Sequence, residues 1–83
     1  MNIAVLTPDR EIFEGTVKSV KVPGTNGSFQ LLENHAAMVS SLGDGKVSIT
    51  KADGESMEFT ISKGFIEVNN NVVSLLVQGV EGV

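Results

Sequence analysis

The sequence predicts an all-β protein of short antiparallel strands, arranged as a β-sandwich or a small barrel. Turn-forming Gly, Asn, Asp and Pro residues recur along all 83 residues. The segments between them are about four to seven residues long, which is strand length rather than helix length. The clearest segment, residues 56–62, reads Ser-Met-Glu-Phe-Thr-Ile-Ser, so polar and apolar residues alternate without exception. This alternation is typical of a strand with one buried face.

Short strands are expected over residues 3–6 and 11–13, with a turn at Gly15. The next segment, 16–22, alternates imperfectly, because Val20 and Val22 share a face that Val17 does not. A β-bulge near Lys18 or Ser19 would restore the register.

Two turn signals follow, Pro23-Gly24 and Asn26-Gly27, and a short apolar strand leads from them to Leu32. The segment after it resists a strand interpretation. Apolar residues and the only histidine lie at helical spacing from Leu32 to Val39, so a helical turn around residues 34–38 stays open.

Two hairpins are expected in the second half. Residues 46–51 and 56–62 flank Asp53-Gly54, and residues 65–68 and 72–77 flank three consecutive Asn residues. The segment 72–77 is nearly all apolar, which predicts a strand covered on both faces.

Length and composition indicate one domain over residues 1–83 with one core. The net charge is −4, and six Lys and Arg are scattered among ten Asp and Glu. Nucleic-acid binding needs a basic stripe, so neither nucleic acids nor acidic membranes are expected partners. The chain has no Cys, which excludes disulfides and thiolate metal sites. Neither a signal peptide nor a membrane-spanning run is expected.

His35 is the first candidate for chemistry. A general base or metal ligand needs partners in a fixed frame, and the other ligand types in this chain are carboxylates, with Glu33 two residues away. We interpret His35 as a structural or contact residue. No catalytic, cofactor-binding or metal-ligating set is predicted.

A small all-β domain without a catalytic set usually works by contact through exposed loops and uncovered apolar residues. Phe29, Leu31, Leu32 and Met38 flank the distinctive Thr25–Ser28 turn, and some of them are expected to stay outside so small a core. We interpret the uncovered ones as a protein-binding edge. A free-standing ligand-binding sandwich is the alternative, which the scarcity of aromatic residues disfavours.

Five short motifs occur in order across nearly the whole chain: Leu6-Thr7-Pro8, Phe13-Glu14-Gly15, Val22-Pro23-Gly24-Thr25-x-Gly27, Asn34-His35-Ala36 and Gly64-Phe65-x-Glu67-Val68. Together they resemble the N-terminal domain of the epsilon subunit of F-type ATP synthases (delta in mitochondria). The resemblance implies a flattened antiparallel β-sandwich of about ten strands.

The resemblance also implies a function. The chain is expected to be a non-catalytic rotor subunit of the central stalk in a proton- or sodium-translocating ATP synthase. It would join the gamma subunit to the polar loops of the membrane c-ring, without forming a homo-oligomer. Its place would be the cytoplasmic face of the bacterial inner membrane, which it would meet only through the c-ring.

Site residues follow from the resemblance by position. The turn formed by Thr25, Asn26, Gly27 and Ser28 is expected to meet the c-ring. A second set is expected to face gamma: Thr7, His35, Ala36, Met38 and Ser40.

The chain departs from the family pattern at several positions. Family members often have an acidic residue in place of Ser28, Pro in place of Ala37, and Gly in place of Gln30 and Lys63. Most family members also continue into two C-terminal helices after the sandwich domain. Residues 1–83 correspond to the sandwich domain alone, so no helical hairpin is expected within them.

Overall fold

Eight strands and no helix make up the computed structural model, which describes all residues from Met1 to Val83. The strands are β1 (Asn2–Leu6), β2 (Glu11–Gly24), β3 (Gly27–Leu32), β4 (Met38–Leu42), β5 (Gly45–Lys51), β6 (Ser56–Ile61), β7 (Lys63–Asn69) and β8 (Val72–Gln78). The chain contains no helix that could cross a membrane. The all-β prediction is confirmed, with fewer strands than the ten expected.

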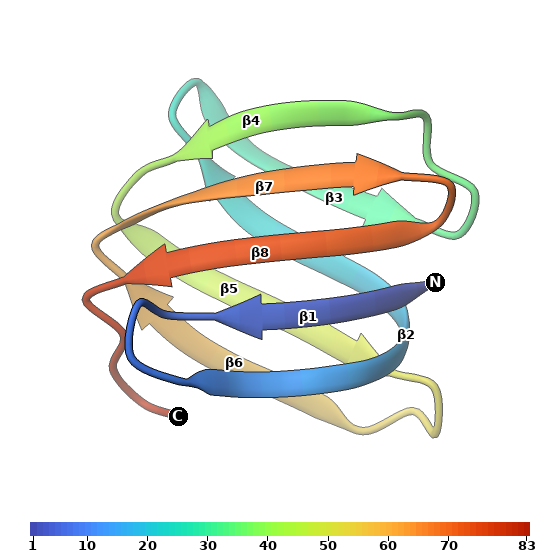
Figure 1. Ribbon diagram of the computed structural model, residues 1–83, viewed down its shortest axis with the longest axis horizontal. Helices are drawn as coiled ribbons and strands as arrows, with labels where there is room; N and C mark the ends of the chain where they lie inside the picture. The colour runs from blue at the N-terminus through green and yellow to red at the C-terminus, as the bar shows by residue number, and fades with distance from the viewer.

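The strands form two layers that face each other across the core (Figure 1). The front layer holds β4, β7, β8, β1 and the first half of β2, and the back layer holds β3, the second half of β2, β5 and β6. Neighbouring strands are antiparallel except for β1 and β8, which are parallel. The two ends of the front layer meet through β2, which pairs with β1 and touches β4 at Gly24.

The long strand β2 joins residues 11–13 and 16–22, which the sequence predicted as two separate strands. Gly15 is not a turn but lies within β2, opposite Ile3 of β1. The β2–β5 register shifts between Val17 and Ser19, so Lys18 is the extra residue of a β-bulge, as the sequence predicted. The bulge lets Val17, Val20 and Val22 all point into the core.

Most of the predicted hairpins are confirmed, with one change. Asn70 and Asn71 both have positive φ angles between β7 and β8, as a tight two-residue hairpin turn requires. The Pro23-Gly24 turn was a wrong prediction, because both residues extend β2 and pair with β3. The chain reverses at Thr25 and Asn26 instead.

The segment after β3 is not helical. Residues 33 and 34 form a turn in which Asn34 has a φ of 63°, and the chain then enters β4. This strand, which the sequence interpretation missed, pairs with β7 along its whole length. The strand is stabilised by hydrogen bonds to β7, a segment distant in the sequence. This pairing, rather than the helical spacing of the local apolar residues, decides the conformation.

The core is a single cluster of seventeen buried apolar side chains, and no polar or charged residue is buried. Both layers contribute inward residues at alternate positions, such as Val47 and Ile49 of β5. The β8 prediction was wrong in one respect. Val73, Leu75 and Val77 are buried, but the other face of β8 is open to solvent.

Gly64 tests how closely β7 and β8 must approach. A Cβ atom there would lie 2.6 Å from the Leu76 carbonyl oxygen and 3.2 Å from Val77 Cγ1, whereas one at Gly43 would meet nothing. We expect Gly64→Ala to lower the free energy of unfolding in urea by about 1–3 kcal/mol, the usual cost of overpacking. Gly43→Ala is the matched control and should change it little. Equal stability of the two variants would contradict this account of the β7–β8 contact.

Candidate protein-binding surface

The outer side of the front layer carries most of the exposed apolar surface. Val39 of β4 is 60% exposed, Phe65 of β7 44%, Val72 of β8 52% and Leu76 of β8 48%. The only other large apolar residues that are exposed are Leu32 and Val83. We call this surface, together with the partly exposed Leu6 of β1, the apolar face.

Strand register makes part of the apolar face continuous. Phe65 of β7 lies opposite Leu76 of β8, and Leu76 lies opposite Leu6 of β1. Side chains on one face of directly paired residues are close enough to touch. A row of three apolar side chains therefore crosses three strands, with Ser41 of β4 next to Phe65 at its end.

The outer side of the back layer is mostly polar by contrast, with Leu32 of β3 as its exposed large apolar residue. Ser48 of β5 donates a hydrogen bond to Glu58 of β6 over 3.3 Å, and Lys46 forms an ion pair with Glu58 at 3.7 Å. Contiguous exposed apolar surface rimmed by polar residues marks interaction sites. The two outer surfaces thus differ in kind, and the front one suits a protein partner.

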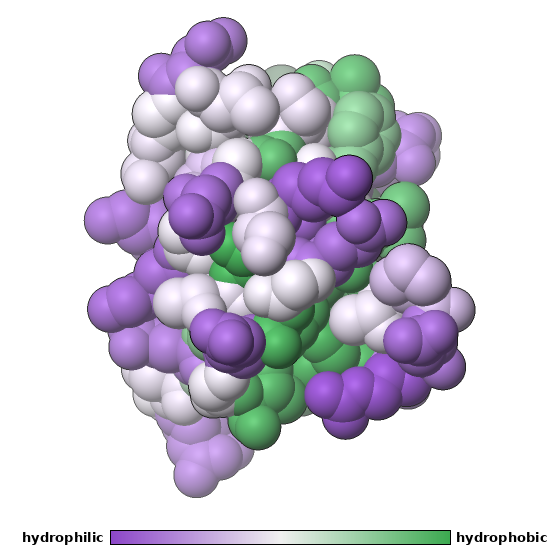
Figure 2. All heavy atoms as spheres, turned by 90° about the vertical axis from the view of Figure 1, so that its left-hand side faces the viewer, coloured by the Kyte–Doolittle hydropathy of each residue, from purple (hydrophilic) through white to green (hydrophobic).

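A pocket of about 360 Å³ opens at the Leu6 end of the front layer. Leu6, Phe65, Leu76 and Val77 supply its apolar lining, and Lys63 and other residues complete it. Figure 2 looks at this end of the molecule, where hydrophilic residues surround apolar surface in the middle and lower part of the view.

The residues predicted to face gamma are spread over the front layer. Thr7 follows β1 and lines the pocket, while Met38 and Ser40 lie in β4. His35 and Ala36 lie in the β3–β4 loop, at the opposite end of the layer from Thr7 (Figure 1). The fold does not gather the five into one cluster, but the row of Leu6, Leu76 and Phe65 lies between β4 and Thr7.

Thr7 also has a local structural role. Its Oγ1 accepts hydrogen bonds from the backbone N–H groups of Asp9 (3.2 Å) and Arg10 (3.0 Å) and donates one to the Arg10 carbonyl (3.1 Å). These hydrogen bonds fix the conformation of the β1–β2 loop, which forms one wall of the pocket through Thr7 and Pro8.

The turn predicted to meet the c-ring is exposed throughout. Its base is attached to the front layer, because the Thr25 N–H donates to the Ser41 carbonyl over 3.3 Å and the two hydroxyl groups lie 3.4 Å apart. The turn therefore projects from the end of β4 as a polar, uncharged tip.

His35 makes a contact within its own loop. Its ring Nδ1 lies 2.8 Å from the Ala36 carbonyl oxygen, and its backbone N–H donates to the Leu32 carbonyl over 3.2 Å. No three His, Asp or Glu side chains come together as a metal site.

Of the four apolar residues around the turn, some of which were expected to stay uncovered, one is exposed. Leu31 is fully buried, and Phe29 and Met38 pack partly against the core, so only Leu32 is exposed. The apolar face was missed, although its signal was present. The outer residues Val72 and Leu76 belong to the nearly all-apolar segment that was assigned to a strand with both faces covered.

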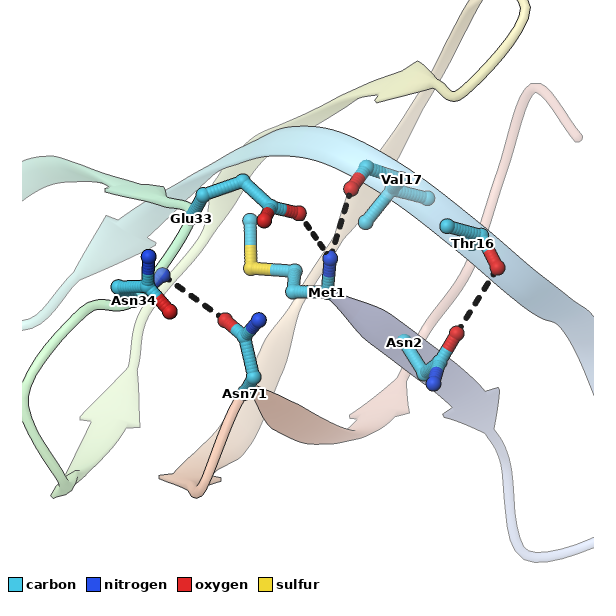
Figure 3. Close-up of polar contacts among 7 residues, drawn as sticks. All are labelled: Met1, Asn2, Thr16, Val17, Glu33, Asn34 and Asn71. Carbon is cyan, nitrogen blue, oxygen red and sulfur yellow. Dashed lines mark hydrogen bonds and ion pairs between the residues drawn. The ribbon is translucent and has the colours of Figure 1, made fainter.

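A polar cluster joins the two layers at the end opposite the pocket (Figure 3). The amino group of Met1 donates to the Val17 carbonyl over 3.3 Å and forms an ion pair with Glu33. Nearby, the Asn34 N–H donates to Asn71 Oδ1 over 2.9 Å. The cluster holds the β3–β4 loop against the start of β1 and the β7–β8 turn.

The Met1 amino group lowers the pKa of the Glu33 carboxyl below its ordinary value of 4.5. The larger cause is the hydrogen bond from that group, followed by attraction to its charge, and Asn71 adds a further hydrogen bond. A lowered pKa in the folded state means that the pair stabilises the fold above about pH 4.5. This stabilisation fades as the pH falls through the folded-state value.

Taken together, the fold and its surface define a small β-sandwich domain that presents one apolar outer face. Comparisons with known proteins give the family. The sequence model of one protein family, described as the ATP synthase Delta/Epsilon chain beta-sandwich domain, matches residues 1–83. The chain belongs to this family.

Curated relatives agree with this family. The chain is 42% identical to the ATP synthase epsilon chain of Leptospira borgpetersenii, over 92% of this chain and 59% of the relative. It is 36% identical to the ATP synthase epsilon chain of Protochlamydia amoebophila, over 98% of this chain and 55% of the relative. The chain therefore spans little more than half the length of these relatives. It spans 86% of the epsilon chain of Chlorobaculum tepidum, with 40% identity.

Two solved structures share the fold. A chain of the Euglena gracilis mitochondrial ATP synthase, solved with OSCP, F1 and c-ring, superimposes with a TM-score of 0.88 at 22% identity, over 95% of this chain and 51% of that chain. A chain from the central stalk and c-ring structure of the Tetrahymena thermophila mitochondrial ATP synthase superimposes with a TM-score of 0.80 at 19% identity. The match covers 98% of this chain and 65% of that chain.

The Glu33 pair gives a pH prediction. Acetylation of the Met1 amino group should raise the pKa of Glu33 towards 4.5, because it removes the positive charge and leaves a single neutral amide N–H as the donor. Carboxyl chemical shifts in an NMR titration measure this directly. Asn71→Ala is the comparison and should raise the pKa less. An unchanged Glu33 titration after acetylation would contradict the assigned pair.

Proposed function

We propose that this chain is a non-catalytic rotor subunit of an ATP synthase, joining the gamma subunit to the c-ring. Ion-driven rotation of the ring would then reach the catalytic head through the joint. The observation that carries the proposal is the match of the whole chain, residues 1–83, to a domain of the ATP synthase delta/epsilon family. The similar folds in ATP synthases solved with their c-rings support it.

The apolar face is the proposed gamma-binding surface. A lasting contact between two rotor subunits benefits from buried apolar area, and the row of Phe65, Leu76 and Leu6 offers this on a rigid sheet. Of the residues expected to face gamma by resemblance, Thr7 supports this placement, because it lines the pocket at the Leu6 end of the row. Met38 and Ser40 pair with the buried Val68 and Ile66, so they lie on the inner side of β4 and do not support it.

The Thr25–Ser28 turn is the proposed contact with the polar loops of the c-ring. A polar partner suits a turn of exposed polar side chains. Its hydrogen bonds to Ser41 would keep the tip fixed relative to the gamma-binding face. The two contacts would therefore be held at a set distance, as a joint that transmits torque requires.

The proposed place follows from the partners. The chain would lie at the cytoplasmic face of the bacterial inner membrane, peripheral to it and attached through the c-ring. Each complex would hold it as a single rotor subunit rather than as a homo-oligomer.

Substitutions on the apolar face test the gamma contact. Leu76→Asp places a charge in the centre of the row, and we expect it to weaken binding to the gamma subunit on the order of 10-fold or more, as for a central interface residue. Gln30→Asp adds the same charge at an exposed position of the back layer and should leave binding unchanged. Calorimetry with purified gamma measures both. Equal affinities for the two variants would refute this placement.

Ser28 tests the c-ring contact separately. The acidic residue that the family often has here would pair with a basic loop, so Ser28→Glu should retain or strengthen attachment to the ring and Ser28→Lys should weaken it. Co-purification of the c-ring with a gamma complex reports attachment, and gamma binding should stay unchanged in both variants. If both variants retain the ring equally, the turn is not the contact.

A further inference from the structure

The pocket at the end of the apolar row has an unusual composition. Its walls are the side chains of Leu6, Phe65 and Leu76, and Lys63 is the only charged residue in its lining. Its volume of about 360 Å³ is at the lower end of the range for ligand pockets, roughly 300–1,000 Å³. One large side chain from a partner is therefore a suitable occupant.

Lys63 has no charged partner within the chain. The ion pairs join Met1 to Glu33 and Lys46 to Glu58, and the residue opposite Lys63 in β8 is the neutral Gln78. Asp9 and Arg10 line an adjoining hollow that shares Thr7, Pro8 and Gln78 with the pocket. The Lys63 ammonium group is thus exposed and free for a carboxylate from outside.

We propose that the pocket anchors a two-part feature of the partner subunit: an apolar side chain that enters it and an adjacent carboxylate that pairs with Lys63. The inference rests on the proposed function, in which gamma covers the apolar face. An aromatic or aliphatic anchor in a desolvated pocket supplies most of the affinity of such a contact. The charge pair at its rim supplies register and specificity.

Charge favours this occupant over a second copy of the chain. A symmetric contact centred on the pocket would bring Lys63 of one copy towards Lys63 of the other, which is repulsive. The net charge of −4 also means that the rest of the chain repels an acidic partner. Lys63 therefore marks where on the apolar face a carboxylate is accepted.

Binding of variants to purified gamma tests the inference. Lys63→Glu should weaken binding about 10-fold or more at low salt, and Lys63→Gln about 3-fold, because the first adds repulsion and the second only removes attraction. The Lys63→Glu loss should shrink at high salt, where exposed charges are screened. Leu76→Ala removes part of the pocket wall and should weaken binding at both salt concentrations.

Lys21→Glu is the matched control, because it makes the same charge reversal at an exposed position of the back layer. It should leave affinity unchanged. If the unmodified chain binds gamma and Lys63→Glu binds equally well, the inference is wrong and the proposed function stands. If the unmodified chain does not bind gamma at all, the proposed function itself fails.

A single Asp→Lys or Glu→Lys substitution in gamma should restore binding of the Lys63→Glu chain. Such a rescue identifies the carboxylate. Failure of every acidic position of gamma to rescue would overturn the pairing.

Discussion

The structure depends on the continuity of β2. This strand of fourteen residues pairs with β1 through its first half and with β3 and β5 through its second half. The bulge at Lys18 turns the strand so that Val17, Val20 and Val22 all face the core. Because both layers share β2, they cannot slide past each other without breaking its hydrogen bonds. A proposed rotor joint needs this property, since torque must pass from one surface to another without shear.

Local patterns in the sequence predicted much of this fold. Strict alternation of polar and apolar residues identified β6, and the Asn run identified the β7–β8 turn. The bulge was identified because a regular strand would place Val17 and Val20 on opposite faces. Glycine misled at Gly15, which was expected to form a turn but lies within β2 and pairs with Ile3 of β1. The strand β4 was missed because its pairing with β7 is a contact between distant segments, which no local spacing records.

The candidate surface was predictable only in part. Resemblance named the Thr25–Ser28 turn and the front-layer positions, and their functional roles remain proposals. The row of Phe65, Leu76 and Leu6 comes from three strands, and only the register brings these side chains together. One signal was available in the sequence, because a nearly all-apolar β8 in so small a domain leaves one face without a cover. Lys63 stands at a position where the family often has Gly. Its proposed role in binding could not be predicted from the sequence, because only the fold shows that it lines the pocket.

The absence of cysteine from the sequence allows a direct measurement of which surface gamma covers. Single substitutions Phe65→Cys and Val39→Cys place thiols on the apolar face, and Ser48→Cys and Gln30→Cys place them on the back layer. Alkylation rates of each thiol are then compared with and without bound gamma. We expect bound gamma to slow alkylation at positions 65 and 39 and to leave the rates at positions 48 and 30 unchanged. Protection of the back layer, with positions 65 and 39 still reactive, would contradict this expectation.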